Sequence, residues 1–411
     1  MRFLIVISVF LLIDAYVFFA LKSLYKSKRS KRVFWTIYLI SWFFLLTTII
    51  LAAVYIGTRS LNSSMWMSFI MGTSFVFLVT KFVLALFLIL EDIFRFFAFV
   101  GKSIQRKELS KENKRSRRKF VANVAYGVAA IPFFSLIYGI LYGKYDFKIH
   151  KQRLKSKRLP ASFNGLKIVQ LSDLHLGSFD NKDAVQNGFN MVNNLEPDLI
   201  LFTGDMVNNL ASEMDGFEEM LSGLKAKHGK YAVLGNHDYA HYVHWDSEEE
   251  RLQNLEELME RIEKTGFKML RNENEAIEIN GEQIYLVGVE NWGNKPFPQI
   301  GDLDLALKST TENDFKILMS HDPDHFGEKV IEHSAFIDLT LSGHTHGSQM
   351  GIEIPGFRWS PVQYRYKRWA GRYEEDGQVL YVNRGFGYLG YPGRVGIWPE
   401  ITEFTLESEL A

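Results

Sequence analysis

Five short clusters in the second half of the sequence contain side chains that commonly bind divalent metals. Each cluster follows an apolar run that is predicted to be a strand, so each lies where a strand ends. Carboxylate, amide and imidazole groups that converge from several strand ends suit a pair of divalent ions, and such a pair suits the hydrolysis of a phosphoester. In chain order the clusters are Asp173-Leu174-His175, Gly204-Asp205, Gly235-Asn236-His237-Asp238, His321 and Gly343-His344-Thr345-His346.

The spacing inside these clusters favours shared metal sites. Asp173 and His175 are separated by one residue, as are His344 and His346. In an extended segment such residues point to the same side, so each pair can face one ion. A glycine precedes Asp205 and permits a tight turn, which would let this carboxylate bridge two ions. We therefore expect three or four ligands for each ion.

Other residues near the clusters suit proton transfer and phosphate binding. An imidazole held by a carboxylate is a common general acid, so we expect His237 to protonate the leaving group and Asp238 to orient it. Arg384 and Arg394 lie in a glycine-rich tail, and either could bind a substrate phosphate. A structural role is an equally open alternative for both arginines.

The region around these clusters predicts an α/β fold. Short apolar segments rich in β-branched and aromatic residues alternate with amphipathic helical segments, and functional residues of such folds lie beyond the carboxyl ends of the strands. The predicted helices cover 182–195, 216–226 and 247–265. The predicted strands cover 166–171, 199–202, 231–234, 284–289, 315–319, 337–341 and 379–382.

The charge distribution divides the 411-residue chain into two parts. Residues 1–160 carry 26 lysines and arginines against 6 acidic residues, which leaves 21 against 41 for the remainder. An acidic second half argues against nucleic acid as a partner, because phosphate backbones require a basic surface. The chain has no cysteine, so thiolate metal ligands are excluded.

The first part of the chain is predicted to cross a membrane four times. Four apolar stretches, each about 20 residues long, cover residues 3–21, 34–56, 66–90 and 120–142. We accordingly expect a membrane region at 1–142, a basic linker at 143–160 and a catalytic domain at 161–411. Asp14 and Lys81 fall inside predicted spans, where an interhelical pair or a water-accessible gap would satisfy their charges.

Basic residues in the short loops predict the orientation. The loops after the first and third stretches are rich in lysine and arginine, whereas the loop between the second and third holds only Arg59. Because basic loops stay in the cytoplasm, this pattern places the catalytic domain outside it. The basic segment 144–158 argues for the opposite orientation.

Residues from about 165 to 411 resemble the calcineurin-like metallophosphoesterases, and in particular their bacterial membrane-associated branch, which reads Leu-Ser-Asp-Leu-His near its start. The resemblance implies a four-layer α/β/β/α sandwich with two metals between the sheets. It implies that Asp173, His175, Asp205 and His346 bind one ion, and that Asp205, Asn236, His321 and His344 bind the other. It also implies that His237 is catalytic and that an arginine like Arg394 recurs near the end.

These observations predict a membrane-anchored phosphoesterase, more specifically a phosphodiesterase, that uses two Mn, Fe or Zn ions to activate a water molecule. A multi-span anchor favours a lipid-linked substrate. One alternative is a cytoplasm-facing hydrolase that cleaves a pyrophosphate bond, as in UDP-diacylglucosamine. Another is a non-catalytic membrane scaffold or transporter whose metal domain is regulatory.

Overall fold

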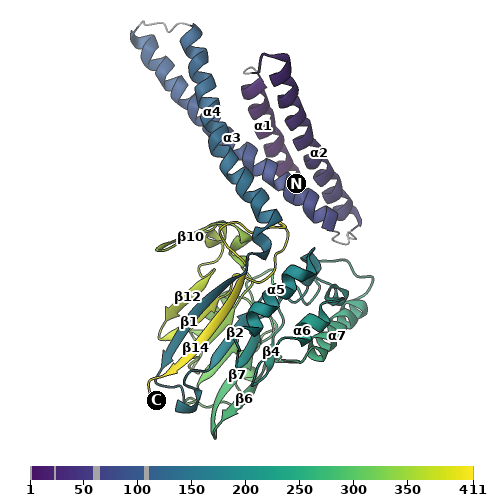
Figure 1. The fold of residues 1–411 in the computed structure, drawn as a ribbon, viewed down its shortest axis with the longest axis vertical. Helices are drawn as coiled ribbons and strands as arrows, with labels where there is room; N and C mark the ends of the chain where they lie inside the picture. Colours follow the sequence, from purple (N-terminus) through teal and green to yellow (C-terminus); the bar gives the residue numbers. More distant parts are fainter. Residues whose placement is uncertain (1, 23–24, 59–64, 106–110, 411) are drawn as a thin grey trace. The chain divides into compact units, whose positions relative to one another are not determined.

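The structure, a computed structural model, describes residues 2–22, 25–58, 65–105 and 111–410. The chain forms two compact units, Met1–Ile140 and Leu141–Ala411. The first unit is helical, and the second contains all the strands (Figure 1).

The helical unit contains long apolar helices. Three segments within these helices are long and apolar enough to cross a membrane: Lys28–Val54, Met67–Gly101 and Lys119–Leu141. The basic loop expected after the third stretch lies partly outside the described residues, at 106–110, and so does Arg59. The helices are α1 (Arg2–Lys22), α2 (Lys28–Thr58), α3 (Met65–Gln105) and α4 (Lys111–Leu141).

A buried ion pair joins three of these helices. Asp14 of α1 is 3% exposed, and its Oδ1 lies 2.5 Å from Nζ of Lys81 on α3. The other carboxylate oxygen accepts hydrogen bonds from the Tyr38 hydroxyl and from Nε1 of Trp42, both on α2. The charges expected inside the spans are therefore paired with each other.

The second unit contains two large mixed sheets. In the first, β2 to β5 run parallel, while β14 is antiparallel to β2 and parallel to β1. Its order is β1 (Lys148–Ser156), β14 (Glu400–Ser408), β2 (Lys167–Leu171), β3 (Leu199–Phe202), β4 (Lys230–Ala232) and β5 (Phe267–Met269).

The second sheet has a parallel centre and antiparallel edges: β7, β8, β9 and β13 are parallel, and β6 and β12 are antiparallel. Its order is β12 (Gly371–Glu375), β13 (Gln378–Val382), β9 (Leu339–Ser342), β8 (Lys316–Met319), β7 (Glu282–Gly288) and β6 (Glu273–Ile279). A separate hairpin is formed by β10 (Ile352–Ile354) and β11 (Phe357–Trp359).

Three apolar clusters hold these elements together. The first packs helices α5 (Lys182–Asn193), α6 (Glu218–Ser222) and α7 (Glu248–Lys264) against the first sheet. The second combines side chains from both sheets, and the third packs α8 (Leu303–Ala306) against the second sheet. The central strands are buried throughout, which explains their nearly continuous apolar sequences.

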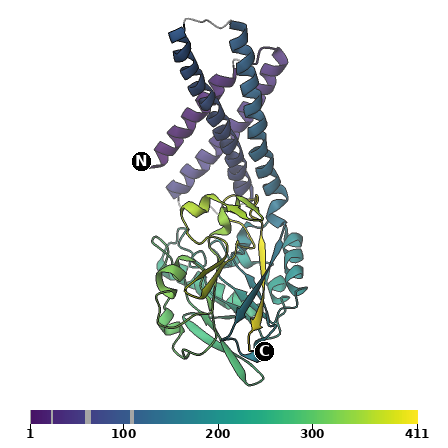
Figure 2. The ribbon, with the colours of Figure 1, turned by 90° about the vertical axis from the view of Figure 1, so that its left-hand side faces the viewer.

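The segment expected to be a basic linker is instead part of the first sheet. Residues 143–160 include the short helix η1 (Gly143–Tyr145) and strand β1, which pairs with β14 over its whole length. Figures 1 and 2 show β1 and the yellow β14 side by side. The basic side chains of β1 face glutamates of β14, as Lys151 does with Glu403 at 3.0 Å. The alternating charges therefore belong to a strand.

All seven predicted strands and all three predicted helices are present, as β2, β3, β4, β7, β8, β9 and β13 and as α5 to α7. The sequence did not reveal the edge strands β1, β6, β12 and β5 or the strand β14. These strands are half-exposed, very short or rich in charged residues, so they lack the continuous apolar pattern.

Candidate metal centre

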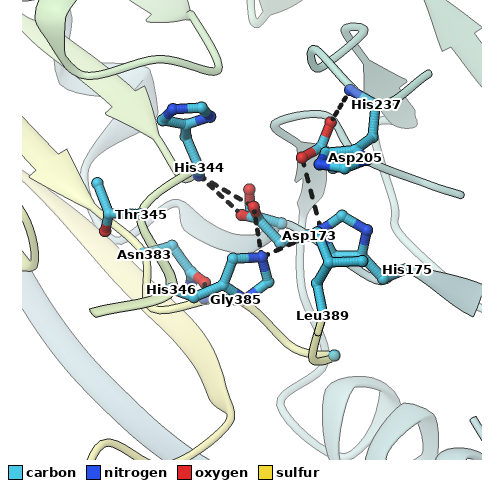
Figure 3. Close-up of polar contacts among 12 residues, drawn as sticks. Asp173, His175, Asp205, His237, His344, Thr345, His346, Asn383, Gly385 and Leu389 are labelled. Carbon is cyan, nitrogen blue, oxygen red and sulfur yellow. Dashed lines mark hydrogen bonds and ion pairs between the residues drawn. The ribbon is translucent and has the colours of Figure 1, made fainter. Parts of the chain in front are cut away.

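The expected ligands meet where parallel strands of the two sheets end. Asp173 and His175 follow β2, Asp205 follows β3, and Asn236 follows β4, all in the first sheet. The remaining ligands come from the second sheet, where His321 follows β8 and both His344 and His346 follow β9. The ends of the strands therefore bring together residues that are more than 170 positions apart (Figure 3).

One group of donor atoms is formed by Asp173, His175 and His346. The Nε2 atoms of the two histidines are 3.0 Å apart, and Nε2 of His346 lies 3.2 Å from Oδ1 of Asp173. All three side chains are buried. The main-chain amide of His344 donates to the Asp173 carboxylate, which links the ends of β2 and β9 (Figure 3).

The second group is formed by Asp205, His321 and His344. Nε2 of His321 lies 3.2 Å from Oδ2 of Asp205. Oδ1 of Asn236 adds a neutral oxygen, 2.7 Å from Nδ1 of His344 and 3.2 Å from Nε2 of His321. The two groups thus divide His344 and His346 between them, although these residues are only two positions apart.

Asp205 lies between the two groups. Its Oδ1 accepts the main-chain amide of His237 at 2.8 Å, which fixes the carboxylate. Its Oδ2 lies 3.5 Å from Nε2 of His175 and 3.2 Å from Nε2 of His321. A single oxygen is therefore in contact with a histidine of each group, as expected for a bridging ligand.

Strained backbone positions these side chains. Asp173, His175, Asp205, His344 and His346 all have positive φ, between 48° and 72°. Non-glycine residues seldom adopt this left-handed conformation, and it often occurs at functional sites. The chain therefore turns at both Asp173 and His175 and is not the extended segment that their spacing predicted.

The loops after β3 and β4 approach each other closely because each has a glycine where they meet. A Cβ atom at Gly235 would lie 2.2 Å from Oδ1 of Asp205, and one at Gly204 would lie 2.5 Å from the Gly235 nitrogen. Larger residues at these two positions would push the carboxylate of Asp205 away from the centre.

The donor set fits divalent cations. Nδ1 of His321 lies 2.8 Å from the Thr203 carbonyl oxygen, so this nitrogen carries a proton and Nε2 is the nitrogen left to bind a cation. That nitrogen faces the Asp205 carboxylate, and the two Nε2 atoms of His175 and His346 also face each other. Imidazole nitrogens and carboxylate oxygens that converge in this way suit Mn, Fe or Zn.

Electrostatics keep most of the ligands in their metal-binding forms. Burial lowers the pKa of His175 to about 3, and it lowers the pKa values of His344 and His346 well below their usual range. Burial opposes ionisation of Asp205, but the surrounding imidazoles, His321 foremost, hold its pKa well below its usual value. Burial alone would lower the pKa of His321, yet the carboxylate of Asp205 raises it to about 10. In the absence of metal, a proton on Nε2 of His321 would therefore lie where a cation would bind.

His237 stands at the edge of the centre. Its ring lies 5.0 Å from that of His175 and is half-buried. Its Nδ1 donates to the main-chain carbonyl of Asn208 at 2.8 Å. This contact leaves Nε2 as the nitrogen that can exchange a proton.

The expected orienting role of Asp238 is wrong. Its carboxylate accepts the main-chain amides of Gly235, Asp205, Met206 and Val207, at distances from 2.8 to 3.2 Å. Asp238 therefore ties the loops after β3 and β4 together, and burial raises its pKa to about 7. The partner that orients His237 is the Asn208 carbonyl.

The two arginines expected to bind substrate are buried. Nη1 of Arg384 lies 2.6 Å from Glu400 and its Nε lies 2.9 Å from Glu353, so the side chain is engaged in ion pairs. Arg394 is fully buried, contacts the Gly387 carbonyl, and has Nη2 3.1 Å from Nδ1 of His346. Arg394 thus contacts a ligand of the centre, whereas Arg384 is held by two glutamates, so the substrate-binding expectation is wrong for Arg384 and unsupported for Arg394.

Two aromatic residues that the sequence analysis missed also contact the centre. The hydroxyl of Tyr366 lies 2.8 Å from Nε2 of His344. The hydroxyl of Tyr242 accepts a hydrogen bond from Nδ2 of Asn236 at 2.8 Å, and its ring lies 4.5 Å from that of His237. Tyr242 comes only six residues after Asn236, a spacing that indicates a place near the site. Tyr366 follows no strand and had no such signal.

Comparison with known proteins agrees with this geometry. Residues 1–144 match the family described as "Probable Calcineurin-like phosphoesterase, transmembrane domain", and residues 166–348 match the family described as "Calcineurin-like phosphoesterase".

Three relatives show how much of the chain is shared. The uncharacterized metallophosphoesterase YkuE of Bacillus subtilis is 30% identical over 304 residues, which cover 72% of this chain and 99% of that protein. An uncharacterized metallophosphoesterase of Helicobacter pylori is 28% identical and covers 90% of this chain and 91% of its own length. The transmembrane protein with metallophosphoesterase domain of Danio rerio is 28% identical, over 76% of this chain and 70% of that protein. The chain belongs to the calcineurin-like metallophosphoesterases and is a multi-pass membrane enzyme of that family.

Proposed function

We propose that this enzyme is a phosphodiesterase whose two metal ions share the carboxylate of Asp205, and whose substrate is lipid-linked. The observation that carries the two-metal part is the contact of Oδ2 of Asp205 with a histidine of each donor group. We assign Asp173, His175, Asp205 and His346 to one ion, and Asp205, Asn236, His321 and His344 to the other.

Each protein group has a distinct task in this proposal. Two divalent ions would supply Lewis acidity, which activates a water molecule and offsets the charge on the phosphate oxygens. Nε2 of His237 is the atom that would give a proton to the leaving-group oxygen when the ring is an imidazolium, because the Nδ1 proton is committed to the Asn208 carbonyl. Asp238 keeps the loops of Asp205 and His237 in register through its four main-chain contacts.

The proposal extends to the architecture. We assign the two sheets and their covering helices to a four-layer α/β/β/α sandwich, and α1 to α4 to four membrane spans with the catalytic unit outside the cytoplasm. The layered apolar clusters support the first assignment, the length of α1, 21 residues, supports a fourth span, and the basic loops support the orientation. We place the start of the catalytic domain near residue 141, because β1 belongs to its sheet.

A direct test is metal-dependent hydrolysis by the full chain in detergent. We would supply Mn²⁺ and compare an aryl phosphodiester with an aryl phosphomonoester, with Asp205→Asn as the inactive control. Faster cleavage of the diester, lost in the variant, is the expected result. Preference for the monoester would overturn the diesterase assignment, and activity that survives in Asp205→Asn would overturn the two-metal assignment.

A further inference from the structure

The β10–β11 hairpin has the opposite polarity to that expected for a hairpin on a water-facing surface. Its register pairs Ile352 with Trp359 and Ile354 with Phe357, so these four side chains share one face. Ile352, Ile354 and Phe357 are 50%, 59% and 52% exposed. Figure 1 shows β10 projecting beyond the two large sheets of the catalytic unit.

The polar residues of the hairpin face the protein instead. Glu353 pairs with Nε of Arg384 at 2.9 Å, and the guanidinium of Arg358 lies over the rings of Trp369 and Tyr373 at 5.0 and 5.7 Å. Antiparallel strands at a surface normally turn the apolar face inward and the polar face toward water. The inverted pattern holds the hairpin in place by its charges and leaves a contiguous apolar face outside, which is a mark of a docking surface.

The chain that follows the hairpin is aromatic and basic. Tyr364 is 80% exposed, and Arg365 and Lys367 are also exposed. Among residues 350–368 the one acidic side chain is Glu353, which is paired with Arg384. An apolar face followed in the chain by an exposed tyrosine and positive charges complements the interface of a bilayer that contains anionic lipids.

The catalytic unit follows a candidate membrane-spanning segment closely in the chain. The candidate membrane-spanning segment Lys119–Leu141 ends at Leu141, and the first element of the catalytic unit begins at Gly143. A single residue separates them, so the catalytic unit cannot leave the membrane surface. We propose that the face formed by Ile352, Ile354 and Phe357, together with Tyr364, Arg365 and Lys367, inserts into the interfacial layer of an anionic bilayer.

The same hairpin is attached to the metal centre. Strand β10 begins six residues after His346. Oγ of Ser360 donates to the Gly347 carbonyl at 2.7 Å, and the Tyr366 hydroxyl reaches His344. Insertion would therefore hold the centre beside lipid headgroups. This deepens the proposed function, on which it rests, to a phospholipid or other lipid-linked phosphoester drawn from the membrane.

The absence of cysteine from the chain gives a clean test of insertion. We would place a single nitroxide label by Ile354→Cys, reconstitute the full chain in nanodiscs of phosphatidylcholine and phosphatidylglycerol, and compare collisions with oxygen and with a water-soluble nickel chelate. Leu305→Cys on α8, where the native side chain is 50% exposed, is the matched control. We expect the label at position 354 to favour oxygen and the label at position 305 to favour the nickel chelate.

Two results would overturn the proposal. Equal access to the nickel chelate at both positions would show that the hairpin remains in water. Protection from both reagents at position 354 would show that it packs against protein, either the helical unit or a second copy of the chain. Neither result depends on catalysis, so insertion can fail while the enzyme assignment stands.

Whether insertion aids catalysis is tested by comparing a bilayer substrate with a water-soluble one. In the Ile354→Ser/Phe357→Ser variant we expect hydrolysis of a bilayer phospholipid analogue to fall roughly tenfold or more, because loss of one buried apolar side chain is enough for such a change. Hydrolysis of a water-soluble aryl phosphodiester should be unchanged, and Leu305→Ser should affect neither. Equal loss of activity on both substrates would overturn the proposal that the hairpin brings lipid substrate to the metal centre. If the wild-type enzyme hydrolysed neither the phospholipid analogue nor the aryl phosphodiester, the result would count against the proposed function and not against insertion of the hairpin.

Discussion

The Nδ1 atom of His237 donates a hydrogen bond to the main-chain carbonyl oxygen of Asn208, 2.8 Å away. This contact fixes which imidazole nitrogen is free, and it is independent of the carboxylate of Asp238. Because the acceptor is main chain, it survives side-chain substitutions nearby.

The first prediction concerns His237→Ala. If His237 protonates the leaving group, kcat for a diester with an alkyl leaving group should fall by about 10²–10⁴-fold. With a nitrophenyl leaving group, which needs no proton, the loss should be far smaller. Steady-state kinetics on both esters, with metal content measured alongside, provide the check. Similar losses with both leaving groups would mean that His237 is not a general acid.

Much of the metal centre could be predicted from sequence, since each ligand directly follows an apolar strand. The partners of the supporting residues could not. His237 is oriented by a carbonyl, a group that every residue carries, so no side-chain pattern identifies it. Arg384 pairs with Glu353 and Glu400, 31 and 16 positions away, and nothing in a glycine-rich tail indicates that its arginine is buried.

Some strands of the fold could likewise be predicted from sequence and others could not. The central strands β3 and β9 are buried on both faces, so their sequences alone identify them. Strand β1 is half-exposed and basic, and its partner β14 begins at Glu400, so Lys148 meets a residue about 250 positions later. Local sequence patterns cannot report a pairing over that distance.

The second prediction concerns this strand. A fragment of residues 161–411 lacks β1 and leaves β14 as an unprotected edge, whereas residues 141–411 retain the pair. We expect the shorter fragment to unfold at a temperature lower by about 5 °C or more, or to aggregate. Thermal unfolding followed by circular dichroism distinguishes the two fragments. Equal stability would show that residues 143–160 are a dispensable linker after all.

The third prediction concerns the stability of the catalytic unit in acid. Burial opposes ionisation of Glu400, but Arg384 lowers its pKa to about 2, below the ordinary 4.5. Since the folded-state pKa is depressed, the stabilisation from this group is complete above pH 4.5 and is lost as the pH falls toward 2. Unfolding by denaturant between pH 7 and pH 2 should show this loss.

A pair of variants isolates the contribution of Arg384. Arg384→Met leaves Glu400 buried without its cation and should cost about 3 kcal/mol at pH 7. The difference from wild type should shrink as the pH falls from 4.5 toward 2, because wild type then loses the stabilisation that its ionised Glu400 provides. Arg372→Met, at an exposed arginine of β12, is the control and should cost little at any pH. A difference that stays constant with pH would refute the linkage.

The fourth prediction concerns Asp14 and Lys81 in the helical unit. Removing one charge leaves the other buried and unpaired, so Asp14→Leu or Lys81→Met alone should each cost about 3 kcal/mol. The double variant should be more stable than the sum of the two losses predicts. Unfolding of the full chain in detergent, in a double-mutant cycle, measures the coupling. Additive losses would show that the pair contributes no coupling energy.

Measurement of metal content shows whether the carboxylate of Asp205 is shared by two metal ions. We would purify the full chain, dialyse it against Mn²⁺, and measure bound metal and the magnetic coupling of the ions by electron paramagnetic resonance. Wild type and the exposed-site control Asp246→Asn should each hold two coupled ions per chain, whereas Asp205→Asn should hold at most one and show no coupling. Two coupled ions retained in Asp205→Asn, or a single ion in wild type, would show that Asp205 does not bridge two ions.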